Sequence, residues 1–185
     1  MREPEPAANT IPVTLVMGNV RQMIGSDLTE LREGLRASLG VERWVDEVVA
    51  ASPFPSAAEL LETAKRAATP LSPQEIDEAI AHHPRIGEKP NGDGQSQAFS
   101  RNEQSSADAD DEELAAAIAA GNQAYEERFG RVFIIRAAGR TRAEILDELT
   151  RRLELTNSTE LEIVGEQLRD IAMLRLEKLY AEESR

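Results

Sequence analysis

The chain has 185 residues, of which 41% are hydrophobic, 30% charged and only 4% aromatic, and its formal net charge is -13. This length suits one well-filled domain, and a core built from aliphatic side chains favours helices over sheets. The negative charge argues against nucleic acid or an anionic membrane as a partner. The chain has no cysteine, which excludes disulfides and thiol nucleophiles and is compatible with a reducing compartment.

The first helix is expected within residues 26–40, after a charged, proline-rich stretch. Residues 1–10 are predicted to form a disordered tail without an apolar leader, and residues 11–181 one helical domain. Leu28, Leu31, Leu35 and Leu39 recur at helical spacing, and Gly40 follows as a natural C-terminal cap. No apolar run reaches the roughly 20 residues that a membrane span needs, so we expect a cytoplasmic protein.

Three later helices are marked by capping residues at their starts. A hydroxyl side chain followed three residues later by glutamate is typical of a helix N-terminus, because each side chain can accept a hydrogen bond from the other's backbone N–H. The pattern occurs at Ser56 and Glu59, at Ser72 and Glu75, and at Thr141 and Glu144.

The second half of the chain predicts a long helix, one extended stretch and two further helices. The long helix begins in the acidic run near residue 107 and ends at Gly130, a residue suited to a left-handed cap. The sequence RVFIIRAAG that follows is the one strand-like stretch, with a short extended segment near residues 132–136. The last helix is expected from residue 158 to 181. The fold class is therefore all-α, with about seven to nine helices in a single compact domain.

The only two histidines, His82 and His83, are adjacent and directly precede Pro84. Neighbouring positions on a helix point about 100° apart, so the two rings cannot share one face. One alternative is structural, a histidine that interacts with the helix dipole at its C-terminal end. A metal site is disfavoured because no His-x-x-x-His pair is present, and none is predicted. A glycine-rich loop follows, and it lacks the Gly-Lys-Ser/Thr ending of a phosphate loop. We interpret residues 85–99 as a lid beside a site.

Arg175 falls on the apolar stripe of the last helix, four residues after Ile171 and four before Leu179. A guanidinium on a core-facing stripe needs an anionic or polar partner, since an uncompensated buried charge is strongly unfavourable. Two interpretations stay open: a structural salt bridge to an interior carboxylate, or an anchor for a planar anionic substrate.

Four motifs occur in an order and spacing that resemble a known family. They are HPRIGEK at 83–89, SRNEQ at 100–104, NQAYEERFGRVFIIRAAGR at 122–140 and EQLRDIAMLRLEKL at 166–179, preceded by RWV and SPF between residues 43 and 54. Together they resemble the 2-oxo-4-hydroxy-4-carboxy-5-ureidoimidazoline (OHCU) decarboxylases of urate breakdown, over roughly residues 28–179.

The resemblance implies which residues act. It places His83 and Glu103 in the catalytic pair and Arg175 as a clamp on the substrate. It implies that main chain from Phe133 to Ala137 lines the pocket. The full set of implied substrate-binding residues is Pro84, Ser100, Arg101, Asn102, Gln104, Phe133, Ile134, Ile135, Arg136, Ala137 and Arg175.

The resemblance also implies an activity: decarboxylation of OHCU to (S)-allantoin and CO2 by a homodimer without cofactor or metal. Two alternatives keep the fold. One is a helical interaction module without activity, and the other is a decarboxylase of a related ureido or imidazoline acid.

Overall fold

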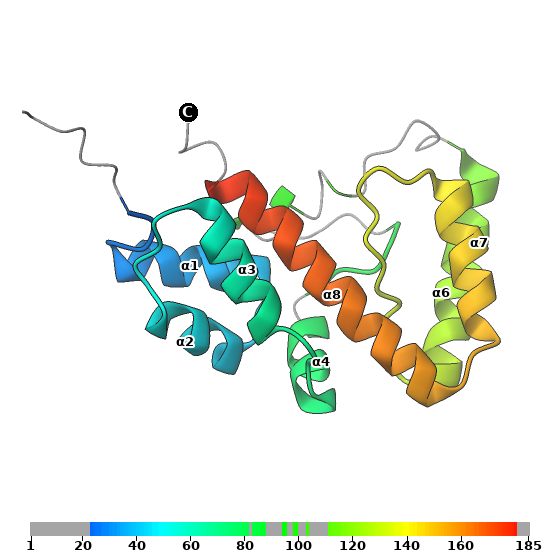
Figure 1. Ribbon diagram of the computed structural model, residues 1–185. Coiled ribbons are helices and arrows are strands. Elements are labelled where there is room, and N and C mark those ends of the chain that lie inside the picture. The colour runs from blue at the N-terminus through cyan, green and yellow to red at the C-terminus, as the bar shows by residue number, and fades with distance from the viewer. Residues whose placement is uncertain are drawn as a thin grey trace, which may run out of the picture.

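The computed structural model describes residues 23–81, 83–87, 94–95, 98–99, 103 and 111–180. Within these ranges seven helices are defined (Figure 1). They are α1 (Leu28–Ser38), α2 (Glu42–Ala50), α3 (Ala57–Ala67), α4 (Pro73–Ile80), α6 (Glu112–Phe129), α7 (Arg142–Leu153) and α8 (Asn157–Tyr180). The described part of the chain contains no strand, only an isolated antiparallel bridge between Ile24 and Phe54. The predicted all-α class is confirmed.

Helix α8 connects the two ends of the molecule. It packs against α1, α3 and α4, whereas α6 and α7 pack against each other. Figure 1 shows α8 crossing from the α6–α7 pair to the group formed by α1, α2 and α3. Gly34 on α1 permits a close approach to α8, because a Cβ atom there would lie 2.5 Å from the Tyr180 hydroxyl.

The buried hydrophobic side chains form two clusters. The larger one, the α8 cluster, comes from α1 to α4 and α8 and surrounds the fully buried Trp44. The smaller one, the α6–α7 cluster, includes Tyr125, Phe133 and Ile135. The segment between α6 and α7 contributes to both clusters, because Ile134 belongs to the first. This alternation of successive side chains is what an extended backbone produces.

Most predicted helix ends are confirmed. Both groups of the capping box are present at Ser72 with Glu75 and at Thr141 with Glu144. Gly130 ends α6 in the left-handed region with φ 67°. The predicted cap at Gly40 is wrong: α1 ends at Ser38, and the next residue, Leu39, is extended with φ -148°. Leu39 is also fully buried, so packing in the α8 cluster overrides the local glycine signal.

Part of the predicted organisation lies outside the described ranges. This applies to the N-terminal tail at residues 1–10, to His82 and to most of the predicted lid at residues 85–99. Within the described part of the chain, no helix has both the length and the apolar character that crossing a bilayer requires.

Candidate active site

Four stretches that are far apart in the sequence meet around a small cavity of about 30 Å³. Eight of the thirteen predicted site residues line it, together with Ile86 and Ile171. The eight are His83, Pro84, Glu103, Phe133, Ile134, Ile135, Ala137 and Arg175. Ser100, Arg101, Asn102 and Gln104 lie outside the described residues. Arg136 is described but is not among the residues that line the cavity.

His83 is positioned by the C-terminal end of α4. Its backbone N–H donates to the Ile80 carbonyl at 2.9 Å, and its ring Nδ1 lies 2.9 Å from the Ala79 carbonyl oxygen. Because a carbonyl can only accept a hydrogen bond, Nδ1 carries the proton in the neutral ring. The buried Nε2 atom then carries the lone pair. The geometry therefore presents a base at Nε2.

Arg175 and Glu103 form a buried, two-pronged ion pair at the cavity wall. Arg175 Nε donates to Glu103 Oε1 at 2.7 Å, and Nη2 donates to Oε2 at 2.8 Å. Their side chains are only 2% and 10% exposed. The Arg175 guanidinium also lies 5.6 Å from the centre of the Phe99 ring. The predicted salt bridge of Arg175 is thus present, and because both partners line the cavity it is compatible with a role in substrate binding.

The extended segment between α6 and α7 is held by side chains from two helices. Arg152 on α7 donates from Nη1 to the Ile134 carbonyl at 2.8 Å. Gln167 on α8 accepts the backbone N–H of Arg136 at 2.9 Å. These two main-chain groups are therefore already used in hydrogen bonds within the protein.

Arg152 belongs to a buried polar network that the sequence interpretation missed. Its guanidinium makes several hydrogen bonds to Glu160, including Nε to Oε1 at 2.9 Å, and both side chains are completely buried. Glu160 also accepts a hydrogen bond from the Tyr125 hydroxyl. Burial and this bond to Glu160 raise the pKa of Tyr125 well above its usual range. The Arg152 guanidinium stacks 4.6 Å from the centre of the Phe133 ring, which is part of the cavity wall.

A sequence signal for this network was available. Arg152 follows Ile145 and Leu149 at helical spacing, and Glu160 precedes Val164 and Leu168 in the same way. Each is therefore a charged residue on an apolar stripe, the pattern that singled out Arg175. Two such residues of opposite charge on consecutive helices indicate a buried pair.

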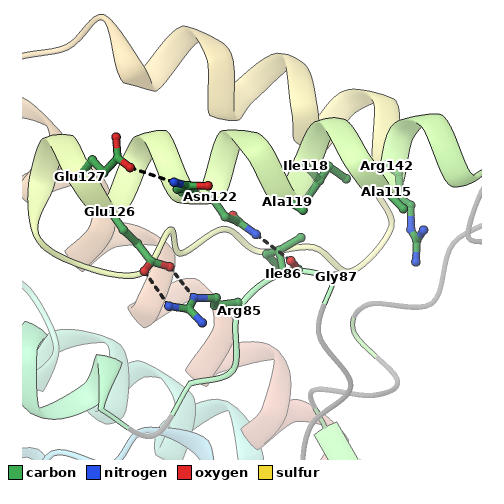
Figure 2. A pocket seen from close by; sticks show the side chains of 11 residues that line it. Arg85, Ile86, Gly87, Ala115, Ile118, Ala119, Asn122, Glu126, Glu127 and Arg142 are labelled. Carbon is green, nitrogen blue, oxygen red and sulfur yellow. Dashed lines mark hydrogen bonds and ion pairs between the residues drawn. The ribbon is translucent and has the colours of Figure 1, made fainter.

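A second, larger cavity of about 420 Å³ lies beside α6 and the residues that follow Pro84 (Figure 2). It is lined by α6, Arg142 and the residues Arg85 to Gly87. Only Ile86 lines both cavities. The larger cavity contains none of His83, Glu103 and Arg175, so its size does not make it the better candidate. The smaller cavity combines a base, a carboxylate and a guanidinium.

Comparison with known proteins identifies the family of the chain. Residues 26–177 match the model of the OHCU decarboxylase family. A 2-oxo-4-hydroxy-4-carboxy-5-ureidoimidazoline decarboxylase from Haloferax volcanii is 30% identical over 76% of this chain and 83% of its own length. A uric acid degradation bifunctional protein from Arabidopsis thaliana is 38% identical, and the match covers 58% of this chain but only 34% of that protein.

The fold is similar to that of a solved relative. A crystal structure of OHCU decarboxylase in the presence of (S)-allantoin superimposes with a TM-score of 0.66 at 27% identity. The alignment covers 80% of this chain and 98% of that one. The family model and the structural match both span most of the described domain, and the chain therefore belongs to the OHCU decarboxylase family.

Proposed function

We propose that the protein decarboxylates OHCU to (S)-allantoin and CO2. The observation that carries the proposal is the small cavity, which is lined by His83, by the Arg175–Glu103 pair and by residues of the extended segment 133–137. Family membership supports the same substrate. Because two relatives are bifunctional proteins of which this chain matches about a third or less, the activity is proposed for this chain rather than transferred from them.

The chemistry needs no external electron sink. The carboxylate of OHCU is attached to a carbon that carries a hydroxyl group and neighbours a ring C=N bond. When the bond to CO2 breaks, its electron pair forms a C=C bond, and the imine nitrogen accepts the displaced π electrons and a proton. The resulting enol then loses its hydroxyl proton, while a proton is added to the ureido-bearing carbon on one face. The product is allantoin, with one new stereocentre.

The tautomer of His83 suits it to accept the proton of the substrate hydroxyl group. With Nδ1 donating to the Ala79 carbonyl, Nε2 can accept a hydrogen bond from the substrate hydroxyl and take its proton as the enol becomes a ketone. The fixed ring orientation means that the base is positioned before the substrate arrives, which is a large part of what a proton-transfer site contributes.

The Arg175–Glu103 pair supplies charge beside the same cavity. The guanidinium is suited to a carboxylate or to the anionic ring oxygen of the intermediate, and Glu103 fixes its plane.

The test follows product formation from fresh substrate. The protein is added to urate together with the two upstream enzymes that generate OHCU, and circular dichroism records (S)-allantoin. The proposal predicts a stereoselective signal that appears faster than the spontaneous reaction. No acceleration would favour an interaction module of the same fold, and acceleration only with another ureido or imidazoline acid would favour a different substrate.

A pair of neighbouring variants tests the role of His83. We expect His83→Asn to lower kcat by at least about 10²-fold, the usual loss when a general base is removed. The matched control is His82→Asn, which removes the adjacent ring and should retain most of the activity. Equal activity of the two variants would contradict the assignment, and unchanged far-ultraviolet circular dichroism would show that both are folded.

Arg175→Leu separates the two interpretations of the arginine. A variant with nearly unchanged Tm that no longer binds substrate supports the anchor role. A large loss of Tm supports the structural salt bridge, because the buried Glu103 carboxylate would lose its partner. In that case Arg175→Leu combined with Glu103→Gln should recover stability without recovering activity.

We further propose that the protein is a cytoplasmic homodimer, on the basis of the family resemblance. Light scattering coupled to size-exclusion chromatography should then give twice the chain mass of 20.4 kDa.

A further inference from the structure

The segment that carries His83 is attached to α6 by two side chains from one face of that helix. Arg85 pairs with Glu126 through two hydrogen bonds, Nε to Oε1 at 2.5 Å and Nη2 to Oε2 at 2.7 Å. Asn122 donates from Nδ2 to the Ile86 carbonyl at 2.9 Å. Asn122 and Glu126 are four residues apart, so they lie side by side on the helix, as Figure 2 shows.

The two attachments differ in burial. The Arg85–Glu126 pair is at the surface, with side chains 46% and 27% exposed, and an exposed pair of this kind contributes little. Asn122 is only 6% exposed. Its bond to Ile86 is therefore the better shielded of the two, and it is placed at a turn where Gly87 has φ 88°.

Asn122 is poorly explained by stability alone. Its Oδ1 atom is buried, and no donor in the described ranges reaches it. Leaving a buried amide oxygen without a partner costs at least as much as one hydrogen bond contributes. Leucine has nearly the same size and would fill the position without this cost, while water could take over at the half-buried Ile86 carbonyl. The amide is thus retained where an apolar side chain would stabilise the fold as well or better.

We propose that Asn122 is a positioning residue for His83, an inference that rests on the proposed function. The segment 83–86 is fixed at its start by the hydrogen bonds of His83 to Ala79 and Ile80. Asn122 fixes its end, at the Ile86 carbonyl. Pro84 lies between them, and its locked φ makes the connection short and stiff. A shift at the Ile86 carbonyl is therefore passed to the imidazole rather than absorbed by the chain.

Replacement of Asn122 should change kcat more than KM, because Arg175 and Glu103 are held by other parts of the chain. Arg175 is on α8 and Glu103 lies in a different segment, so neither depends on Asn122. We expect Asn122→Leu to lower kcat by roughly 10- to 100-fold, the scale of a displacement of about 1 Å in a catalytic group, and to change KM by less than about threefold. Its Tm should equal or exceed that of the wild type.

The matched control is Gln123→Leu, which removes the next amide along the same helix. Gln123 is exposed and its side chain bonds only to Glu127 on α6 among the described residues. This variant should keep the wild-type kcat, KM and Tm. A loss of kcat equal to that of Asn122→Leu would mean that any apolar change on α6 disturbs the site, and would overturn the inference.

A spectroscopic measurement tests the inference without any activity. The chain has two histidines, so ¹⁵N spectra of the imidazole rings in a His82→Asn background report His83 alone. The wild-type contact with Ala79 predicts a ring protonated at Nδ1 when neutral. In Asn122→Leu the Nδ1–H population should fall, whereas Gln123→Leu should leave it unchanged.

The outcomes of these experiments are distinct. A wild-type protein without activity refutes the proposed function, while the tautomer measurement still decides the positioning role. An active wild type with an equally active Asn122→Leu variant and an unchanged ring spectrum refutes the positioning role. Parallel losses of Tm and kcat, or failure of Asn122→Leu to fold, would show that the amide is structural and would also refute it.

Discussion

Removal of Arg152 tests how strongly the buried network supports the fold. Arg152→Met leaves the Glu160 carboxylate completely buried, with the Tyr125 hydroxyl as its remaining side-chain partner among the described residues. Removing one partner of a buried ion pair typically costs about 3–5 kcal/mol. Solvent does not screen this pair, because both side chains are 0% exposed. For a chain of this size, at about 2–4 °C per kcal/mol, Tm should fall by roughly 6–20 °C.

The neighbouring residue supplies the control. Arg151 pairs with Glu148 at 2.7 Å, but its side chain is 53% exposed, and a surface pair of this kind contributes about 0–1 kcal/mol. Arg151→Met should therefore lower Tm by less than about 4 °C. Thermal unfolding followed by circular dichroism at 222 nm measures both variants under identical conditions.

A double variant separates charge from packing. In Arg152→Met combined with Glu160→Gln, the amide can still accept the Tyr125 hydroxyl and no buried charge remains, so stability should recover part of the loss. The reasoning is refuted if Arg152→Met is as stable as Arg151→Met. It is also refuted if the double variant is as unstable as the sum of the two single variants.

Three smaller effects are expected. Gly130→Ala should destabilise by about 1 kcal/mol through its left-handed φ alone, because no atom lies within 4 Å of the added Cβ. Gly121→Ala should lower Tm more, since the added Cβ would lie 2.5 Å from Leu149 Cδ2 in the α6–α7 contact. The Arg85 guanidinium lowers the pKa of the Glu126 carboxyl. The stability from this pair is present above the ordinary carboxyl pKa and lost as pH falls through the lowered one. The Glu126→Gln variant should therefore be slightly less stable than the wild type at pH 6, and the difference should shrink as the pH falls below the ordinary carboxyl range.

The helices could be predicted from sequence because their signals are local. A capping box such as Ser72 with Glu75 involves four consecutive residues and forms whatever surrounds it. The error at Gly40 has the opposite origin. There the chain leaves α1 extended and Leu39 is buried in the α8 cluster, whose members come from as far along the chain as Tyr180.

The site shows the same limit. The position of Arg175 on an apolar stripe predicted a buried partner, but the stripe does not identify that partner. It is a carboxylate 72 residues earlier in the chain. The resemblance supplied Glu103 as a member of the site, and the structure then placed the two in contact. Neither the stripe nor the resemblance could show that the backbone N–H of Arg136 bonds to Gln167 within the protein.

The location of the cavity explains why side chains from several different helices hold the main chain around it. Ile134 and Ile171 belong to the α8 cluster, whereas Phe133, Ile135 and Ala137 belong to the α6–α7 cluster. The cavity therefore lies where two separately packed parts of the core meet. Its reacting groups come partly from segments without regular structure, and such segments keep a fixed position only if side chains from neighbouring helices hold their main chain. Arg152 and Gln167 do this for the segment 133–137, and Asn122 does it for the segment that follows His83. These residues do not contact the substrate in the proposed reaction. They fix the main chain of the cavity, and with it the distance between the reacting groups and the substrate.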